Sequence, residues 1–364
     1  MKSSTMLRHR VGSLLIVGIE GASLATLEAA WLRAVQPSGV ILFRRNVESP
    51  AQVHALFHGV EQTLSQPYFR CVDLEGGTVD RLRDLIGSTP SAAEVAATQN
   101  LRTFREHGTF IGRALHSLGF NVDLAPVLDL ALPAAQPVMG TRVISADPAQ
   151  VAAYAREFVA GLAQHSVAGC GKHFPGLGGG TLDSHHAMPR IPRTWKEVWA
   201  QDLEPYRALA SALPLVMVNH AAYPKIEKTP QPASLSRFWI QEVLRDKLRY
   251  RGLVVSDDME MGGVLNHTSL EEAAVEAIAA GTDLLEICHR ADRVLITHEA
   301  LLREAERSPA FARRVTAAAV RIAKAKQRLI AKAPLPKPVS AAGLRELQDA
   351  QQRLRDRIAK ARKP

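Results

Sequence analysis

Eight short apolar runs, separated by helical patterns, constrain the fold of this chain more than any other feature of its sequence. The runs are rich in Val, Ile and Leu and do not alternate between apolar and polar residues, which is typical of parallel strands that are buried on both faces. They begin at Ser13, Gly39, Tyr68, Phe120, Gly169, Leu215, Gly252 and Leu284.

The segments between the runs carry helical signals. One apolar helical face comprises Val53, Leu56, Phe57, Val60 and Leu64. A second helix is expected from about Leu270, because Ser269 and Glu272 form a capping-box pattern and Gly281 supplies a residue for the C-terminal cap. Strands that alternate with helices indicate an α/β fold, either an open doubly wound sheet or a closed barrel. The number of strands favours a (β/α)₈ TIM barrel.

The chain divides into a barrel and a basic tail. We expect residues 1–332 to form a single TIM-barrel catalytic domain, and residues 333–364 to form a proline-containing linker and a basic amphipathic helix. The helix has an apolar stripe of Leu344, Leu347, Leu354 and Ile358, which Gln351 interrupts. The stripe could pack on the barrel, on a second subunit or on nothing, and the oligomeric state stays open.

The positive charge lies mainly in this tail. The net charge is +9, and residues 331–364 hold nine Lys and Arg against three Asp and Glu, so the tail carries 9 − 3 = +6 and the first 330 residues only +3. This distribution is more typical of a solvated helix face than of a nucleic-acid site. We therefore expect no nucleic-acid partner.

Cysteine placement and the N-terminus suggest a cytoplasmic protein. Cys71, Cys170 and Cys288 lie in or beside apolar runs, as buried thiols do, and not in a disulfide framework. The sequence shows neither a signal-peptide pattern nor an apolar stretch of about 18 residues that could span a membrane. We expect a soluble protein in a reducing compartment, with no membrane partner.

Polar residues gather where the apolar runs end. In a barrel, the carboxyl ends of the strands form one mouth, which is where barrel enzymes place their active sites. This distribution already suggests catalysis. The residues are Asp73, Glu75, Asp123, Lys172, His173, Asn219, His220, Asp257 and Asp258.

The segment from Lys172 to Pro189 has the densest chemistry, with several glycines that permit loop movement. Asp183 can accept the ring N–H of His185, which suits that histidine to proton transfer. A zinc site of His173, Asp183, His185 and His186 is a weaker alternative, because no helix-borne histidine pair or cysteine pair fixes the ligand spacing. The histidines could also be incidental to a surface loop. We expect no metal and no cofactor.

Two further strand ends carry carboxylates. Adjacent residues of a strand point to opposite sides, so one of Asp257 and Asp258 can face a substrate while the other supports the fold. Asp73 and Glu75 should share one side of their strand end, before a turn at Gly76 and Gly77. Either carboxylate could accept hydrogen bonds from substrate hydroxyl groups. For Glu75, a structural salt bridge is an interpretation of at least equal weight.

Together these segments resemble the β-N-acetylhexosaminidases of glycoside hydrolase family three, over about Leu14 to Gly281. The motifs occur in the family's order: DLEGGTVDR from Asp73, APVLD from Ala125, GTR from Gly140, KHFPG from Lys172 with DSH from Asp183, and SDDMEM from Ser256.

The resemblance implies a role for each matched residue. Asp257 would be the nucleophile, and His185, oriented by Asp183, the general acid/base. Asp258 would not be the nucleophile. The residues that would hold the terminal N-acetylglucosamine are Asp73, Arg81, Arg142, Lys172 and His173.

One departure bears on this assignment. After KHFPG the family usually has His-Gly-Asp-Thr, whereas this chain has Leu177, Gly178, Gly179 and Gly180, which puts loop closure, rate and substrate range in question. A histidine acid/base also leaves room for an anionic acceptor, so a phosphorylase of the same family is an alternative to a hydrolase. A sugar-binding protein with little turnover is a third reading. A β-glucosidase is less probable, because about thirty residues after the barrel leave no room for the second domain of those enzymes.

The expected function is removal of terminal β-linked N-acetylglucosamine through a covalent glycosyl-aspartate. The expected partner is a small amino-sugar glycoside, or a muropeptide from cell-wall recycling.

Overall fold

The computed structural model describes residues 2–180, 188–330 and 334–361. Within this part of the chain, eight parallel strands close into a barrel in the order β1-β10-β9-β8-β7-β6-β3-β2. Each strand overlaps one of the apolar runs, so the predicted (β/α)₈ barrel is confirmed. The strands are β1 (Leu15–Gly18), β2 (Gly39–Leu42), β3 (Phe69–Val72), β6 (Val122–Asp123), β7 (Ala168–Phe174), β8 (Leu215–Val218), β9 (Leu253–Asp258) and β10 (Leu284–Ile287).

The barrel closes between the first and last strands. Leu15 of β1 pairs with Leu285 of β10, and Ile16 of β1 pairs with Gly39 of β2. All four residues of β2, β3, β8 and β10 are buried. Side chains of these strands contact the barrel interior on one face and helices on the other, which explains why the runs do not alternate.

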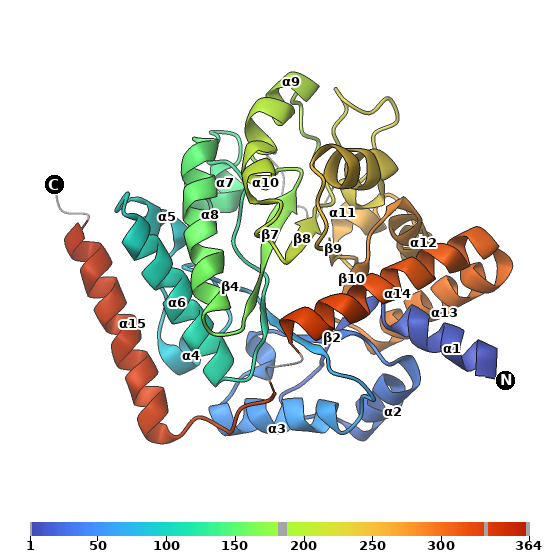
Figure 1. Cartoon of the computed structure of the whole chain (residues 1–364), viewed down its shortest axis with the longest axis horizontal. Helices are drawn as coiled ribbons and strands as arrows, with labels where there is room; N and C mark the ends of the chain where they lie inside the picture. Colours follow the sequence, from blue (N-terminus) through green and yellow to red (C-terminus); the bar gives the residue numbers. More distant parts are fainter. Residues whose placement is uncertain (1, 181–187, 331–333, 362–364) are drawn as a thin grey trace.

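Helices surround the strands (Figure 1). The α-helices are α1 (Lys2–Gly12), α2 (Thr26–Val35), α3 (Pro50–Glu61), α4 (Arg83–Ile86), α5 (Ala92–Ala96), α6 (Leu101–Ser117), α7 (Gln136–Met139), α8 (Pro148–Ala163), α9 (Trp195–Glu197), α10 (Glu204–Leu209), α11 (Gly262–Leu265), α12 (Leu270–Ala280), α13 (Ala291–Arg307), α14 (Pro309–Leu329) and α15 (Ala341–Ala361). The shorter 3₁₀ and π segments are η1 (Arg44–Asn46), η2 (Gly140–Arg142), η3 (Val198–Asp202), η4 (Ala233–Leu235) and η5 (Phe238–Lys247).

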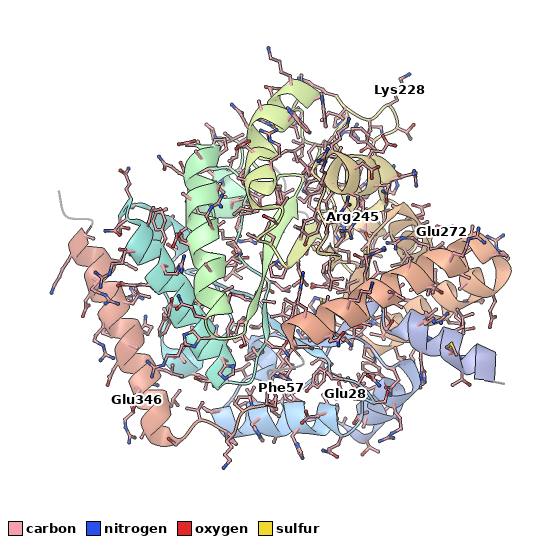
Figure 2. All side chains as sticks on the ribbon, in the orientation of Figure 1. Glu28, Phe57, Lys228, Arg245, Glu272 and Glu346 are labelled. Carbon is pink, nitrogen blue, oxygen red and sulfur yellow. The ribbon has the colours of Figure 1, made fainter. Side chains whose placement is uncertain are left out.

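Both helices that the sequence indicated between the strands are present. The α3 residue Phe57 is buried and packs edge-on against Phe120, with 5.1 Å between the ring centroids (Figure 2). The α12 helix has the predicted capping box, in which the Ser269 side chain accepts the N–H of Glu272, and it ends at Gly281 with φ 128°. A positive φ favours glycine, so the end of α12 is set locally.

Two runs are only partly strand. After β3, the segment β4 (Leu74–Gly76) leaves the barrel and pairs antiparallel with β5 (Val79–Asp80) through a turn in which Gly76 and Gly77 have φ 84° and 61°. The run from Phe120 is regular strand only at Val122–Asp123. Pro126 then lacks the N–H that a longer ladder would need.

The C-terminal helix α15 packs on the barrel, which resolves the open alternative. It lies along the outer edge of the molecule against α4 and α6 (Figure 1). Leu347, Leu354 and Ile358 are buried there, and Gln351 is buried as well. The Gln351 amide donates to the carbonyl of Ser88, so the polar interruption of the stripe is a hydrogen-bonding position.

The three cysteines are buried free thiols, as predicted. In the ranges that the model describes, no helix combines the length and apolar character needed to cross a membrane.

Candidate active site

The polar strand ends meet at one mouth of the barrel. Asp73 directly follows β3, Lys172 and His173 lie near the end of β7, and Asp257 lies near the end of β9. These strands are parallel members of one barrel, so their carboxyl ends open on the same face. The chain therefore brings these side chains together from positions that are up to 184 residues apart, since 257 − 73 = 184.

Lys172 lies at the centre of a buried ion-pair network. Its Nζ is 2.7 Å from Oδ1 of Asp73 and 2.7 Å from Oε1 of Glu75. Arg142, in η2, grips the same Glu75 with two hydrogen bonds, from Nε at 2.8 Å and from a terminal nitrogen at 2.9 Å. Asp73 and Glu75 therefore share one side of the strand end, as predicted. Glu75 also makes the salt bridges that the structural interpretation required.

Electrostatics keep this network ionised. Burial alone would lower the pKa of Lys172, but Asp73 and Glu75 raise it above its ordinary value. Burial alone would raise the pKa of Glu75, but Arg142 and Lys172 lower it below its ordinary value. A charged pair at this depth is held by mutual attraction and hydrogen bonds, and loss of one partner would leave the other unpaired.

His173 is oriented by a carboxylate from the segment that follows β6. Its Nδ1 lies 2.6 Å from Oδ2 of Asp129, and its Nε2 lies 3.3 Å from a terminal nitrogen of Arg142. The second oxygen of Asp129 accepts the backbone N–H of Leu177 at 2.6 Å. Asp129 thus ties the histidine ring to the start of the loop that follows β7.

Asp257 is an ionised carboxylate beside these groups. Burial alone would raise its pKa, but His173, His220, the backbone N–H of Asp258 and Lys172 lower it below its ordinary value. That N–H donates to Oδ1 of Asp257 at 2.9 Å. An ionised carboxylate at a strand end has the protonation state that a nucleophile needs.

Asp258 makes different contacts. Its Oδ1 accepts the backbone N–H of Glu260 at 3.0 Å, and its Oδ2 lies 3.1 Å from Nε2 of His289. Its side chain therefore contacts the turn after β9 and His289, which follows β10. The two aspartates have separate environments, as alternation along a strand requires.

Arg81 does not join the network. Four of the five sugar-binding candidates are connected by ion pairs and hydrogen bonds through Glu75 and Arg142, namely Asp73, Arg142, Lys172 and His173. The Arg81 guanidinium instead lies 5.8 Å from the ring centroid of Phe43, and its Nε has no hydrogen-bond partner among the described residues.

Asp183 and His185 lie outside the described residues, as does His186 of the zinc alternative. The preceding loop is described as far as Gly180. Leu177 packs against an apolar cluster of the barrel wall. A Cβ on Gly178, the glycine that the family motif shares, would lie 2.8 Å from the carbonyl oxygen of Leu130, so this position requires glycine. The departure is confined to Leu177, Gly179 and Gly180, and at Leu177 apolar packing takes the place of the motif's histidine.

Sequence reasoning missed two buried carboxyl groups. Asp129 lies within the APVLD motif but was not assigned a role, although it orients His173. Glu286 of β10 is 2% exposed, and its Oε1 has no hydrogen-bond partner in the described chain. Burial, with the negative charges of Asp73 and Asp257, raises the pKa of Glu286 well above its ordinary value. A lone charged residue inside the apolar run from Leu284 was the signal that could have revealed it.

Comparison with known proteins places this geometry in context. The family model described as "Glycosyl hydrolase family 3 N terminal domain" matches residues 6–325. A protein of Idiomarina loihiensis named Beta-hexosaminidase is 34% identical over 279 residues, covering 76% of this chain and 83% of that protein. A Beta-hexosaminidase of Bordetella avium is 37% identical over 292 residues, covering 76% and 81%. A solved glycoside hydrolase family 3 beta-N-acetylglucosaminidase from Paenibacillus sp. FPU-7 superposes with a TM-score of 0.90 at 31% identity, covering 96% of this chain and 68% of that one.

Proposed function

The chain belongs to glycosyl hydrolase family 3 and is a glycosidase, and on this premise we propose that it removes terminal, non-reducing β-linked N-acetylglucosamine with retention of configuration. The observation that carries the proposal is the ionised carboxylate of Asp257 in the mouth that also holds Lys172, Arg142 and His173. The names of the relatives support the choice of an N-acetylhexosamine as the sugar.

The ion-pair network supports binding of the terminal sugar. Within the described chain, Oδ2 of Asp73 makes no hydrogen bond or ion pair, and the side chain is 14% exposed, so this oxygen can accept a hydrogen bond from a sugar hydroxyl. Lys172 and Arg142 are held in place by Glu75, so their remaining N–H groups can donate to sugar oxygens without a large loss of side-chain entropy. Rigid donors and acceptors of this kind favour one orientation of the ring.

In the proposed first step, a carboxylate oxygen of Asp257 bonds to the anomeric carbon while the bond from that carbon to the leaving oxygen breaks. His185 gives its proton to the leaving oxygen, and Asp183 orients the ring. In the second step, His185 takes a proton from water, the water oxygen bonds to the anomeric carbon, and Asp257 leaves. Two inversions give net retention. The roles of His185 and Asp183 rest on the sequence motif.

We also propose that the natural substrate is a muropeptide or a related amino-sugar glycoside from cell-wall recycling in the cytoplasm. Three buried free thiols support a reducing compartment. The proposed natural substrate could be wrong without affecting the proposed reaction.

A substrate screen tests the proposal. Nitrophenyl β-glycosides of N-acetylglucosamine, glucosamine, glucose and xylose are incubated with the protein, with and without inorganic phosphate. Nitrophenol release only from the N-acetylglucosaminide, with free sugar as product in both conditions, is the expected result. If a sugar 1-phosphate were the main product when phosphate is present, the protein would be a phosphorylase and not a hydrolase. Saturable binding of N-acetylglucosamine with no release above a buffer blank would indicate a binding protein.

A further inference from the structure

A second pocket lies at the opposite end of the barrel from the candidate active site. Its lining includes Ser13 and Ser38, which come shortly before β1 and β2, and Pro67, which comes before β3. These are the amino-terminal ends of the strands. The walls are formed by α1 and α14, which lie side by side (Figure 1).

The pocket has the size and lining of a small-molecule site. Its volume is about 440 Å³, within the range of about 300 to 1,000 Å³ that is common for ligand pockets. The apolar part of the lining comprises Met6, Pro67, Ala319, Ile322 and Ala323. The polar part combines the basic or titratable His9, Arg10 and Lys326 with uncharged serine and glutamine side chains, and none of the described lining residues is acidic.

Lys326 has no acidic partner in the described chain. Its Nζ lies over the ring of Phe69, whose centroid is 5.8 Å away, and makes no ion pair in the described chain. Arg10, on the facing helix, donates to the Thr316 hydroxyl at 3.2 Å and makes no ion pair in the described chain. Both side chains are half-buried, and neither has an acidic partner in the described chain. An anion bound between them would be attracted to both groups.

We propose that this pocket binds a small amphiphile with a single carboxylate, a medium-chain fatty acid in its chemistry. The carboxylate would contact Lys326 and Arg10, and the alkyl chain would lie against Ile322, Ala319 and Met6. The pocket is separate from the glycosidase site, and the proposal does not depend on the identity of the sugar.

The protonation state of Lys326 provides a second measurable consequence of carboxylate binding. Burial lowers the pKa of Lys326 to about 7. The titratable groups facing it are His9 and Arg10 from α1 and the Cys71 thiol from β3, and none of these supplies a negative charge at neutral pH. A bound carboxylate favours the ammonium form, so binding just above neutral pH should draw a proton from the buffer.

The experiment is calorimetric titration of the full chain with decanoate at pH 7.5, in two buffers that differ in ionisation enthalpy. Decan-1-ol tests the alkyl chain alone and acetate tests the head group alone. The wild type should bind one decanoate at least tenfold more tightly than decan-1-ol, bind acetate far more weakly, and take up protons with decanoate. His9→Gln should retain that uptake.

Two variants and one control complete the test. Lys326→Met should weaken decanoate binding at least tenfold, abolish proton uptake and leave decan-1-ol binding unchanged. Ala323→Trp should fill the pocket and weaken both ligands. Lys324→Met, on an exposed position of the same helix, should change neither. Circular dichroism and the unfolding temperature establish that each variant is folded.

Three results would overturn the assignment. The first is no saturable decanoate binding to the wild type. The second is equal affinity for decanoate and decan-1-ol, which would describe an apolar cavity only. The third is decanoate binding that involves no proton uptake or is unaffected by Lys326→Met, because the carboxylate would then lie elsewhere.

Discussion

The ammonium of Lys172 lies 2.7 Å from Oε1 of Glu75, and the side chains are 3% and 2% exposed, respectively. Lys172 also pairs with Asp73, while Arg142 holds the other side of Glu75. Two cations and two carboxylates thus balance one another in the mouth of the barrel. Loss of any one of these charges would leave a buried partner uncompensated, so we expect the network to contribute to stability.

Lys172→Met should destabilise the protein by about 3–5 kcal/mol, because it leaves buried carboxylates without a partner. Urea unfolding measures the loss. Lys228→Met, at an exposed position (Figure 2), is the matched control and should stay within about 0.5 kcal/mol of the wild type. The double variant Lys172→Met with Glu75→Gln should lose less than the sum of the single variants. A loss below about 1 kcal/mol for Lys172→Met would contradict a buried, coupled network.

Asp257→Ala should reduce kcat/KM at least a thousandfold, equivalent to about 4 kcal/mol of transition-state stabilisation, with the fold intact. No other described carboxylate shares the environment of Asp257. Asp258→Ala should keep measurable turnover but unfold at a lower temperature, since it frees the N–H of Glu260 and the ring of His289. If the two variants behave in the opposite way, the nucleophile is Asp258.

The first-formed sugar should have the β configuration, because a covalent glycosyl-aspartate requires two inversions. Proton NMR of the product within the first minutes, before mutarotation, reads the anomeric signal directly. If the α-product appeared first, the mechanism would be a single, inverting attack by water and not a double displacement.

His185→Ala should slow cleavage of a disaccharide far more than glycosylation by an activated aryl glycoside. A nitrophenolate leaves readily without a proton, whereas a sugar alkoxide does not. The measurement is kcat/KM against leaving-group pKa, which should become steeper in the variant. Asp183→Ala should give a milder change in the same direction. An equally shallow dependence in wild type and variant would assign the proton to another group, with His186 the first to test.

Protonation of His107 should contribute to acid unfolding. This histidine is fully buried, its Nδ1 lies 2.9 Å from the Tyr154 hydroxyl, and burial lowers its pKa to about 4. The unfolded chain takes up the proton near pH 6.5, so this contribution is present above that pH and is lost as the pH falls toward 4, to a total of about 3 kcal/mol. His107→Gln should flatten the dependence of unfolding free energy on pH across this window. His58→Gln, at an exposed position, should leave the slope unchanged, and an unaltered slope in His107→Gln would contradict the prediction.

Local patterns in the sequence were enough to predict the barrel and its mouth. Strands that are buried on both faces need continuous apolar runs, and the capping of α12 depends only on Ser269, Glu272 and Gly281. Because parallel strands end on one face, residues at the ends of the runs had to converge there. Residue type and sequence position were therefore sufficient to predict the strands of the barrel and the face on which the polar residues converge.

The charges and partners in that mouth were decided only by the tertiary structure. Whether Lys172 pairs with Glu75, and whether Arg81 joins that network, depends on distances set by the registers of β3 and β7 against β6 and by the hairpin after β3. The protonation of Glu286 likewise depends on burial and on carboxylates from other strands. The electrostatic energy of two charges depends on their separation and on the polarity of their surroundings. The sequence pattern of a strand indicates which way a side chain faces, but it does not give the distance from that side chain to a charge on another strand.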